Sequence, residues 1–222
     1  MSSTGRFGVE RVPVTPFQQN CSLVWDPATR HAFVIDPGGD VDKLLGRIKA
    51  ADLTVDAILL THGHLDHVGG ANALRNALEA RQGNGSVRLI GPSREDDFLL
   101  NSVETQAAHF GINDLHNAQP DCYTSDGETF TLLNRVYEVR HVPGHTPGHV
   151  VFFDAKDKVV FAGDTLFRGT VGRTDFPYGD SKQLIDSIHE KIIPLGDDVV
   201  VLPGHGAPTT VGAERINNPF LQ

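Results

Sequence analysis

The chain alternates short apolar blocks with polar stretches, a pattern that predicts strands interleaved with helices. Apolar or β-branched runs of about four to eight residues between turn-forming residues are typical of strands. By this pattern we expect strands at Ser22–Trp25, Ala32–Ile35, Ala57–Leu60, Val87–Ile90, Val136–His141, His149–Phe153, Lys158–Ala162 and Val199–Leu202. A mixed set of this kind predicts an α/β fold, with helices layered against central sheets.

Three segments place apolar residues three and four positions apart, as expected for helices with one buried face. They are Val41–Ala51, Gly70–Arg81 and Ser181–Ile193. Asp40 is placed to cap the first helix. Asp180 and Gln183 have the spacing of a capping box at the start of the third helix, which Pro194 should end. We expect residues 91–120 to be mainly helical.

Three of the expected strands lead directly to a residue that can bind a metal. The strands that end near positions 60, 162 and 202 are followed by His62, Asp164 and His205. The loops at the C-terminal ends of strands are where α/β proteins usually carry their functional sites. This recurrence is the first indication of a metal site.

Composition narrows the possible functions. The 222 residues are enough for one domain, which we expect to span residues 1–222. Contents of 39% hydrophobic and 21% charged residues are typical of a soluble globular protein. A formal charge of -9 argues against nucleic acid and anionic membranes as partners. No apolar run reaches the ~18 residues that a membrane-spanning helix needs.

We do not expect an exported protein. Its opening segment has no apolar run of the kind found in signal peptides. Cys21 and Cys122 are expected to be free thiols in a reducing compartment. We therefore expect a cytoplasmic protein, and the sequence does not indicate its oligomeric state.

The densest group of potential ligands is THGHLDHVGG at residues 61–70, which holds His62, His64, Asp66 and His67. Imidazole and carboxylate groups suit Zn, Fe or Mn, and they converge only where the backbone turns tightly. Gly63 permits such a turn. In an extended segment His62 and His64 project to one face, while the other two leave it in other directions. The cluster can therefore supply ligands to two adjacent metals.

Three further segments add single ligands. In HVPGHTPGH, residues 141–149, two Pro-Gly turns hold His145 at an apex between two strands, so we expect it to be a ligand. His141 and His149 are expected to be core or supporting histidines. Asp164 in FAGDTLF can bridge two metals and balance their charge. His205 in LPGHG completes the set.

Together these motifs resemble the metallo-β-lactamase superfamily, in order and in spacing, from Asp36 in IDPGG to His205 in LPGHG. Within it the chain is most similar to the glyoxalase II group, especially its short bacterial members. The supporting segments are VTPFQQNCSLVWD, GHTPGH and GDTLFRGTVGRTDF. The resemblance implies a four-layer αβ/βα sandwich with the site at one edge of two facing sheets.

The resemblance also implies two divalent metal ions, zinc above all, with iron or manganese as alternatives. It assigns three ligands to each metal and one bridge: His62, His64 and His145 to the first, Asp66, His67 and His205 to the second, and Asp164 to both. Asp36 and His149 would not bind a metal but would support the ligands by hydrogen bonds.

The implied reaction is the hydrolysis of a thioester, with S-lactoylglutathione as the expected small-molecule substrate. A water shared by two metals is deprotonated near neutral pH and can attack a carbonyl. Asp66, both ligand and carboxylate, is expected to act as the catalytic residue that orients this hydroxide. The sequence thus predicts a hydrolase similar to hydroxyacylglutathione hydrolases.

The chain departs from full-length glyoxalase II, whose C-terminal helical domain holds the glutathione carboxylates. Only 17 residues (222 minus 205) follow His205 here, so we expect a high KM and a loose preference for the thiol portion. Arg168 and Arg173 are the nearest basic candidates for binding a substrate anion. A solvated or ion-paired loop arginine is an equal alternative for each.

Other functions remain open. Persulfide dioxygenases of the same superfamily share a stretch like Gly172–Phe176 and use one iron, bound by residues matching His62, His145 and Asp164. The intact His205 favours two metals and hydrolysis. A non-enzymatic metal-binding module is disfavoured, because a structural site would favour cysteine ligands and neither cysteine lies near a ligand. Nuclease and β-lactamase activities have weaker support. The acidic net charge argues against a nuclease, and the missing secretion signal argues against a β-lactamase.

Overall fold

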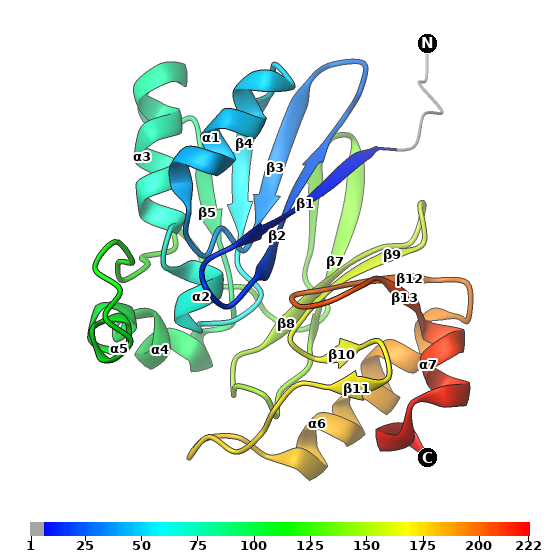
Figure 1. The fold of residues 1–222 in the computed structure, drawn as a ribbon. Coiled ribbons are helices and arrows are strands. Elements are labelled where there is room, and N and C mark those ends of the chain that lie inside the picture. The colour runs from blue at the N-terminus through cyan, green and yellow to red at the C-terminus, as the bar shows by residue number, and fades with distance from the viewer. Residues whose placement is uncertain (1–6) are drawn as a thin grey trace. The chain divides into compact units, whose positions relative to one another are not determined.

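The chain forms two compact units, each with its own sheet and its own apolar core (Figure 1). The structure, a computed structural model, describes residues 7–222. Unit 1 consists of the residues up to Gly91 together with Phe98–Tyr123, and unit 2 of Pro92–Asp97 and Thr124–Gln222. The chain thus enters unit 2 briefly at residues 92–97 before it returns there from residue 124 onward.

Unit 1 is built on a five-stranded sheet in the order β1-β2-β3-β4-β5. The strands are β1 (Gly8–Val14), β2 (Gln19–Trp25), β3 (His31–Ile35), β4 (Thr54–Leu59) and β5 (Arg88–Ile90). The helices are α1 (Val41–Ala50), α2 (Leu65–Val68), α3 (Ala71–Gln82), α4 (Asp97–Leu100) and α5 (Val103–His109). β1, β2 and β3 are antiparallel, whereas β3, β4 and β5 are parallel.

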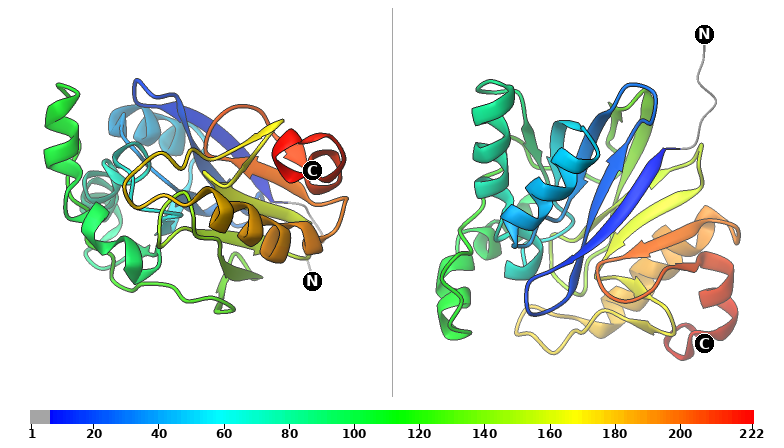
Figure 2. Two further views of the ribbon diagram at one scale, coloured as in Figure 1. Left: turned by 90° about the horizontal axis from the view of Figure 1, so that it is seen from below. Right: turned by 45° about the horizontal axis from the view of Figure 1, so that its top comes forward.

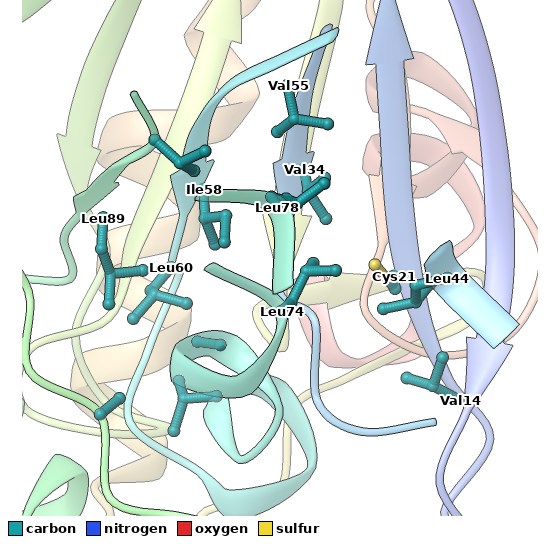
Figure 3. Packing of buried hydrophobic residues seen from close by; sticks show 14 of the residues in the cluster. Val14, Cys21, Val34, Leu44, Val55, Ile58, Leu60, Leu74, Leu78 and Leu89 are labelled. Atoms are coloured by element: carbon teal, nitrogen blue, oxygen red, sulfur yellow. The ribbon is translucent and has the colours of Figure 1, made fainter. Parts of the chain in front are cut away.

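Helices α1 and α3 lie side by side on one face of this sheet (Figures 1 and 2). Their apolar stripes, which include Leu44 of α1 and Leu74 and Leu78 of α3, are buried against Val34 and Ile58 of the sheet (Figure 3). Burial of one such side chain stabilises the fold by about 1.5–3 kcal/mol. This packing fixes β3 and β4, which are followed by Asp36 and by the 61–70 cluster, respectively.

Unit 2 is built on a six-stranded sheet in the order β13-β12-β9-β8-β7-β6, with a two-stranded sheet of β10 and β11. The strands are β6 (Thr129–Leu132), β7 (Arg135–His141), β8 (Val150–Asp154), β9 (Val159–Gly163), β10 (Leu166–Phe167), β11 (Thr170–Val171), β12 (Val200–Pro203) and β13 (Thr209–Thr210). The helical segments are η1 (Arg94–Asp96), α6 (Ser181–Ser187), η2 (Ile188–Ile192), η3 (Ile193–Leu195), α7 (Val211–Asn217) and η4 (Pro219–Leu221).

The core of unit 2 forms where alternate strand residues meet the helices. Val151 of β8, Val160 of β9 and Val201 of β12 are buried in one cluster with Leu184 of α6 and Ile188 of η2. β9 and β12 are parallel neighbours, while the other strand pairs of this sheet are antiparallel. The core therefore holds in place the two strands that precede Asp164 and His205.

The predicted strands are all present, but three expectations about helices need correction. Asp40 occupies the N-cap position of α1 without capping it, because its carboxylate accepts a hydrogen bond from the backbone N–H of Thr15 (3.1 Å). The third helix is α-helical only to Ser187 and continues through a π turn and a 3-10 turn that contains Pro194. Within residues 91–120, η1, α4 and α5 lie between residues 94 and 109 and a loop follows, so the expected helical segment is present but shorter than predicted.

Two remaining expectations concern cysteine chemistry and membranes. Cys21 is buried and Cys122 is half-buried, and both are free thiols. Among the described residues, none of the helices has the length and apolar character needed to cross a bilayer.

Candidate metal centre

In unit 1, the parallel pairing of β3 with β4 brings together the residues that follow these strands. Asp36 follows β3, and Thr61 and His62 follow β4. Asp36 Oδ1 accepts a hydrogen bond from the Thr61 backbone N–H (2.8 Å), and Oδ2 accepts one from the Thr61 hydroxyl (2.6 Å). The Asp36 side chain is buried, and its φ of 52° is a left-handed conformation that Asp adopts more readily than most residues.

These contacts determine which nitrogen of two histidines can bind a metal. The Thr61 hydroxyl gives its one hydrogen to Asp36, so it accepts the Nδ1–H of His62 at 3.0 Å. Asp36 Oδ2 also accepts the Nδ1–H of His67, at 2.9 Å. Both rings then carry their proton on Nδ1, and Nε2 is the nitrogen with the lone pair that a metal needs.

The donor atoms of the 61–70 cluster lie in two pairs. His62 Nε2 and His64 Nδ1 are 3.0 Å apart, while His67 Nε2 and Asp66 Oδ2 are 3.9 Å apart. The latter two residues lie in the single turn of α2, which packs closely on Gly38. A Cβ at Gly38 would stand 1.5 Å from the Asp66 carbonyl oxygen, so only glycine permits this approach.

In unit 2, the parallel neighbours β9 and β12 bring Asp164 and His205 together. Asp164 Oδ2 lies 3.5 Å from His205 Nε2 and 3.6 Å from His145 Nε2. One carboxylate oxygen therefore faces both histidine nitrogens. The bridging role expected of Asp164 stays a prediction.

Two further contacts orient the groups of unit 2. His145 donates its Nδ1–H to the Arg173 carbonyl oxygen at 2.7 Å, so Nε2 is the nitrogen with the lone pair that a metal needs. His149 Nε2 accepts the backbone N–H of Asp164 at 2.9 Å, and the ring is completely buried. A histidine in that position is neutral and carries its proton on Nδ1. It holds Asp164 through the backbone, and the supporting role expected of it at the metal centre stays a prediction.

The two arginines proposed to bind a substrate anion have other contacts. Arg173 forms two N–H···O bonds of 2.7 Å with Asp175, and its guanidinium lies 4.6 Å from the centre of the Phe176 ring. The hydrogen bonds with Arg173 lower the pKa of Asp175 to about 2, and those with Asp175 raise the pKa of Arg173. Arg168 is exposed and lines a cavity of about 490 Å³ with residues of β13 and α7, none of them a predicted ligand.

Sequence reasoning missed several residues that support the ligands. Thr61 stands in the ligand motif itself, and its hydroxyl could have been recognised there. The Arg173 carbonyl could not, because every residue offers the same backbone oxygen. Asp96, whose carboxylate contacts the turn after His145, lies in the acidic run REDD, which reads as an ordinary solvated surface.

The residues fit a transition-metal centre. The donor groups are imidazole nitrogens and carboxylate oxygens, a set that suits Zn, Fe or Mn without strong selectivity. In unit 1, His62 Nε2 and His64 Nδ1 lie 3.0 Å apart, close enough for both to bind one ion. Hydrogen bonds to carboxylate, hydroxyl and carbonyl partners fix the rings of His62, His67 and His145, as is usual for metal-bound histidines.

Fold and residues together define the class of protein. The family model of the metallo-beta-lactamase superfamily matches residues 14–205, and the chain belongs to this superfamily of metallo-hydrolases. The α/β fold class predicted from the sequence is confirmed as the metallo-β-lactamase fold.

The chain is also similar to individual proteins of this superfamily. The chain is 46% identical over 214 residues to the hydroxyacylglutathione hydrolase GloC of Haemophilus influenzae, covering 96% of this chain and 97% of that protein. It resembles the crystal structure of the BLEG-1 B3 metallo-β-lactamase, with a TM-score of 0.85, 34% identity and coverage of 96% and 99%. It also resembles a di-iron-bound form of TTHA1623, with a TM-score of 0.83, 37% identity and coverage of 96% and 100%.

Proposed function

We propose that the chain is a metal-dependent thioester hydrolase whose substrate is a hydroxyacylglutathione, with S-lactoylglutathione as the expected compound. The observation that carries this proposal is the 46% identity to a hydroxyacylglutathione hydrolase over nearly the whole of both chains. The TPFQQN, GHTPGH and GRTDF segments add to it, because they led to the same group from the sequence alone.

The proposed centre holds two divalent metal ions. Their ligands are those expected from the family pattern: His62, His64 and His145 for the first, Asp66, His67 and His205 for the second, and Asp164 between them. The di-iron form of a relative that is 37% identical supports a two-metal centre. We propose zinc as the usual metal, with iron or manganese as alternatives, because the nitrogen and oxygen donors do not discriminate strongly among them.

When bound, the metals supply a hydroxide at neutral pH and polarise the substrate carbonyl. The chain's own residues supply orientation and charge. Asp66 accepts a hydrogen bond from the attacking water and so directs it, and Asp164 places negative charge between the histidines of unit 2. Asp36 holds the His67 ring directly and the His62 ring through Thr61, so both rings present Nε2 throughout the reaction.

A β-lactam is the second candidate substrate, favoured by the 34% identity to BLEG-1 over 96% of the chain. A lactam amide and a thioester are both acyl compounds open to attack by hydroxide. They differ in the leaving group, since a thiolate departs without a proton whereas an amine needs one. The seven proposed ligands include no additional acid for that protonation, which favours the thioester.

One purified preparation tests these alternatives. We expect hydrolysis of S-lactoylglutathione that is lost in His62→Ala and kept in His31→Ala, a control in which an exposed histidine bonded to Asp56 is removed. Hydrolysis of a β-lactam without thioester hydrolysis would replace the proposal by the lactamase. Oxygen uptake with glutathione persulfide would replace it by the one-iron dioxygenase.

A further inference from the structure

We propose that Asp96 is a positioning residue for the metal bound by His145, an inference that rests on the proposed function. The Asp96 side chain is completely buried, and both of its carboxylate oxygens contact the turn that carries His145. Oδ2 accepts the hydroxyl hydrogen of Thr146 at 2.7 Å, and Oδ1 accepts the backbone N–H of Gly148 at 2.6 Å. Hydrogen bonds to an ionised carboxylate are shorter and stronger than neutral ones.

The backbone reinforces this contact. The carbonyl oxygen of Gly148 accepts a hydrogen bond from the backbone N–H of Ser93 at 3.1 Å. A Cβ on Gly148 would lie 2.5 Å from the Asp96 backbone nitrogen, so the two segments meet too closely for any side chain. Residues 92–97, which belong to unit 2, are thus packed closely against the turn that carries His145.

The contacts of Asp96 affect His145 because they lie on the residues that directly follow it. Thr146 follows His145 directly, and on its other side the ring is held by the Arg173 carbonyl. Asp96 therefore fixes the backbone beside the ligand, while the carbonyl fixes the ring. Gly148 also precedes His149, which holds the Asp164 backbone, so the same carboxylate steadies both ends of the turn.

Asp154 provides a control for the loss of any buried carboxylate. It too is completely buried, and its Oδ1 accepts the backbone N–H groups of Lys156 (2.8 Å) and Asp157 (3.2 Å) in the turn between β8 and β9. No predicted ligand lies in that turn. Asp96→Ala and Asp154→Ala should both lower the unfolding temperature, but only Asp96→Ala should change the affinity for metal.

The experiment measures zinc affinity and unfolding temperature on the same preparations. Zinc is titrated into metal-free protein in competition with a chromophoric chelator, for the wild type, Asp96→Ala, Asp96→Asn, Thr146→Val and Asp154→Ala. We expect Asp96→Ala to weaken one of the two zinc sites about 10- to 100-fold, the usual effect of removing a group that orients a ligand. Asp96→Asn should restore most of it, because its amide can accept from Gly148 and donate to Thr146. Thr146→Val should cause a smaller loss at the same site.

The outcomes separate this inference from the proposed function. Unchanged zinc affinity in Asp96→Ala, or an equal loss in Asp154→Ala, would overturn the role of Asp96. Should Asp96→Ala fail to fold, unchanged affinity in Thr146→Val would overturn it instead. A wild type that binds two zinc ions with these mutational effects, yet hydrolyses no thioester, would contradict the proposed function and leave the role of Asp96 standing.

Discussion

At the scale of single residues, a few hydrogen bonds determine which ring nitrogen of each candidate histidine carries the proton. The hydroxyl of Thr61 is the clearest case, because it accepts from His62 and donates to Asp36. We expect Thr61→Val to leave the Nδ1–H of buried His62 without its acceptor, which costs about 1–3 kcal/mol of unfolding free energy. Denaturant unfolding of the metal-free protein measures this, and Thr61→Ser should restore the wild-type value. Equal stabilities for the two variants would show that the hydroxyl is not part of the network.

A second prediction concerns access to Arg173. Its guanidinium is bonded to Asp175 and both side chains are largely exposed, so a substrate carboxylate would have to compete with Asp175. We expect Asp175→Asn to lower KM for S-lactoylglutathione about 1.5- to 5-fold, the equivalent of the ~0.2–1 kcal/mol of an exposed ion pair. KM for a thioester of a small uncharged thiol should not change. An equal change for both substrates would mean that the variant acts through the loop and not through Arg173.

The same pair has a defined pH dependence. Arg173 lowers the pKa of Asp175 to about 2, so the contribution of the pair is complete above the ordinary pKa of a carboxyl group. It is lost only as the pH falls toward about 2. We therefore expect the ratio of KM values for Asp175→Asn and wild type to stay constant across the neutral range. A ratio that changes there would indicate that another group controls Arg173.

At the scale of elements, α6 shows how local sequence fixes a boundary. The Asp180 carboxylate accepts the backbone N–H of Gln183 at 2.9 Å, as the capping-box spacing predicted. We expect Asp180→Ala to lower the unfolding free energy by about 1 kcal/mol, and Asp180→Ser to recover most of this loss. Denaturant unfolding measures both. A full loss in Asp180→Ser would mean that the contribution of Asp180 is not that of a cap.

The interior strands could be predicted from the sequence. Of the edge strands, β5 was predicted, but β1, β6 and β13 were not. β3, β8 and β9 are largely apolar runs in which almost every residue is buried. β1 was missed because it is an edge strand in which polar residues and Pro13 interrupt the pattern. β4 begins three residues before its prediction, since the register shift opposite Ala32 and Phe33 inserts Asp56 and breaks the alternation.

The candidate site was predictable to the extent that its chemistry lies in side chains that are close together in the sequence. The 61–70 cluster stands out by density alone. Asp164 and His205 became candidates because each follows a strand, and the parallel pairing of β9 with β12 then explains why they meet. Asp96 could not be found in this way, because its partners lie 50 and 52 residues further along the chain.

At the scale of the whole molecule, metal bound by the proposed ligands should stabilise the folded chain, because the unfolded chain does not hold these side chains in place. A ligand bound only by the folded state at about 100 times its Kd adds about 2.7 kcal/mol. For a chain of this size that corresponds to an unfolding temperature about 5–11 °C higher. Thermal unfolding with and without a chelator measures the difference. Identical temperatures, in protein shown to lose its metal, would contradict a metal centre held by the folded chain.

The central claim is that the chain hydrolyses a thioester with two metal ions, and activity as a function of metal content tests it most directly. Metal-free protein is reconstituted with increasing zinc, and S-lactoylglutathione hydrolysis is followed by the loss of thioester absorbance. We predict that activity rises until about two ions are bound per chain, as expected of a two-metal site, and that Asp164→Asn weakens the binding of both ions. Full activity at one ion per chain, or no thioester hydrolysis at two, would contradict the account.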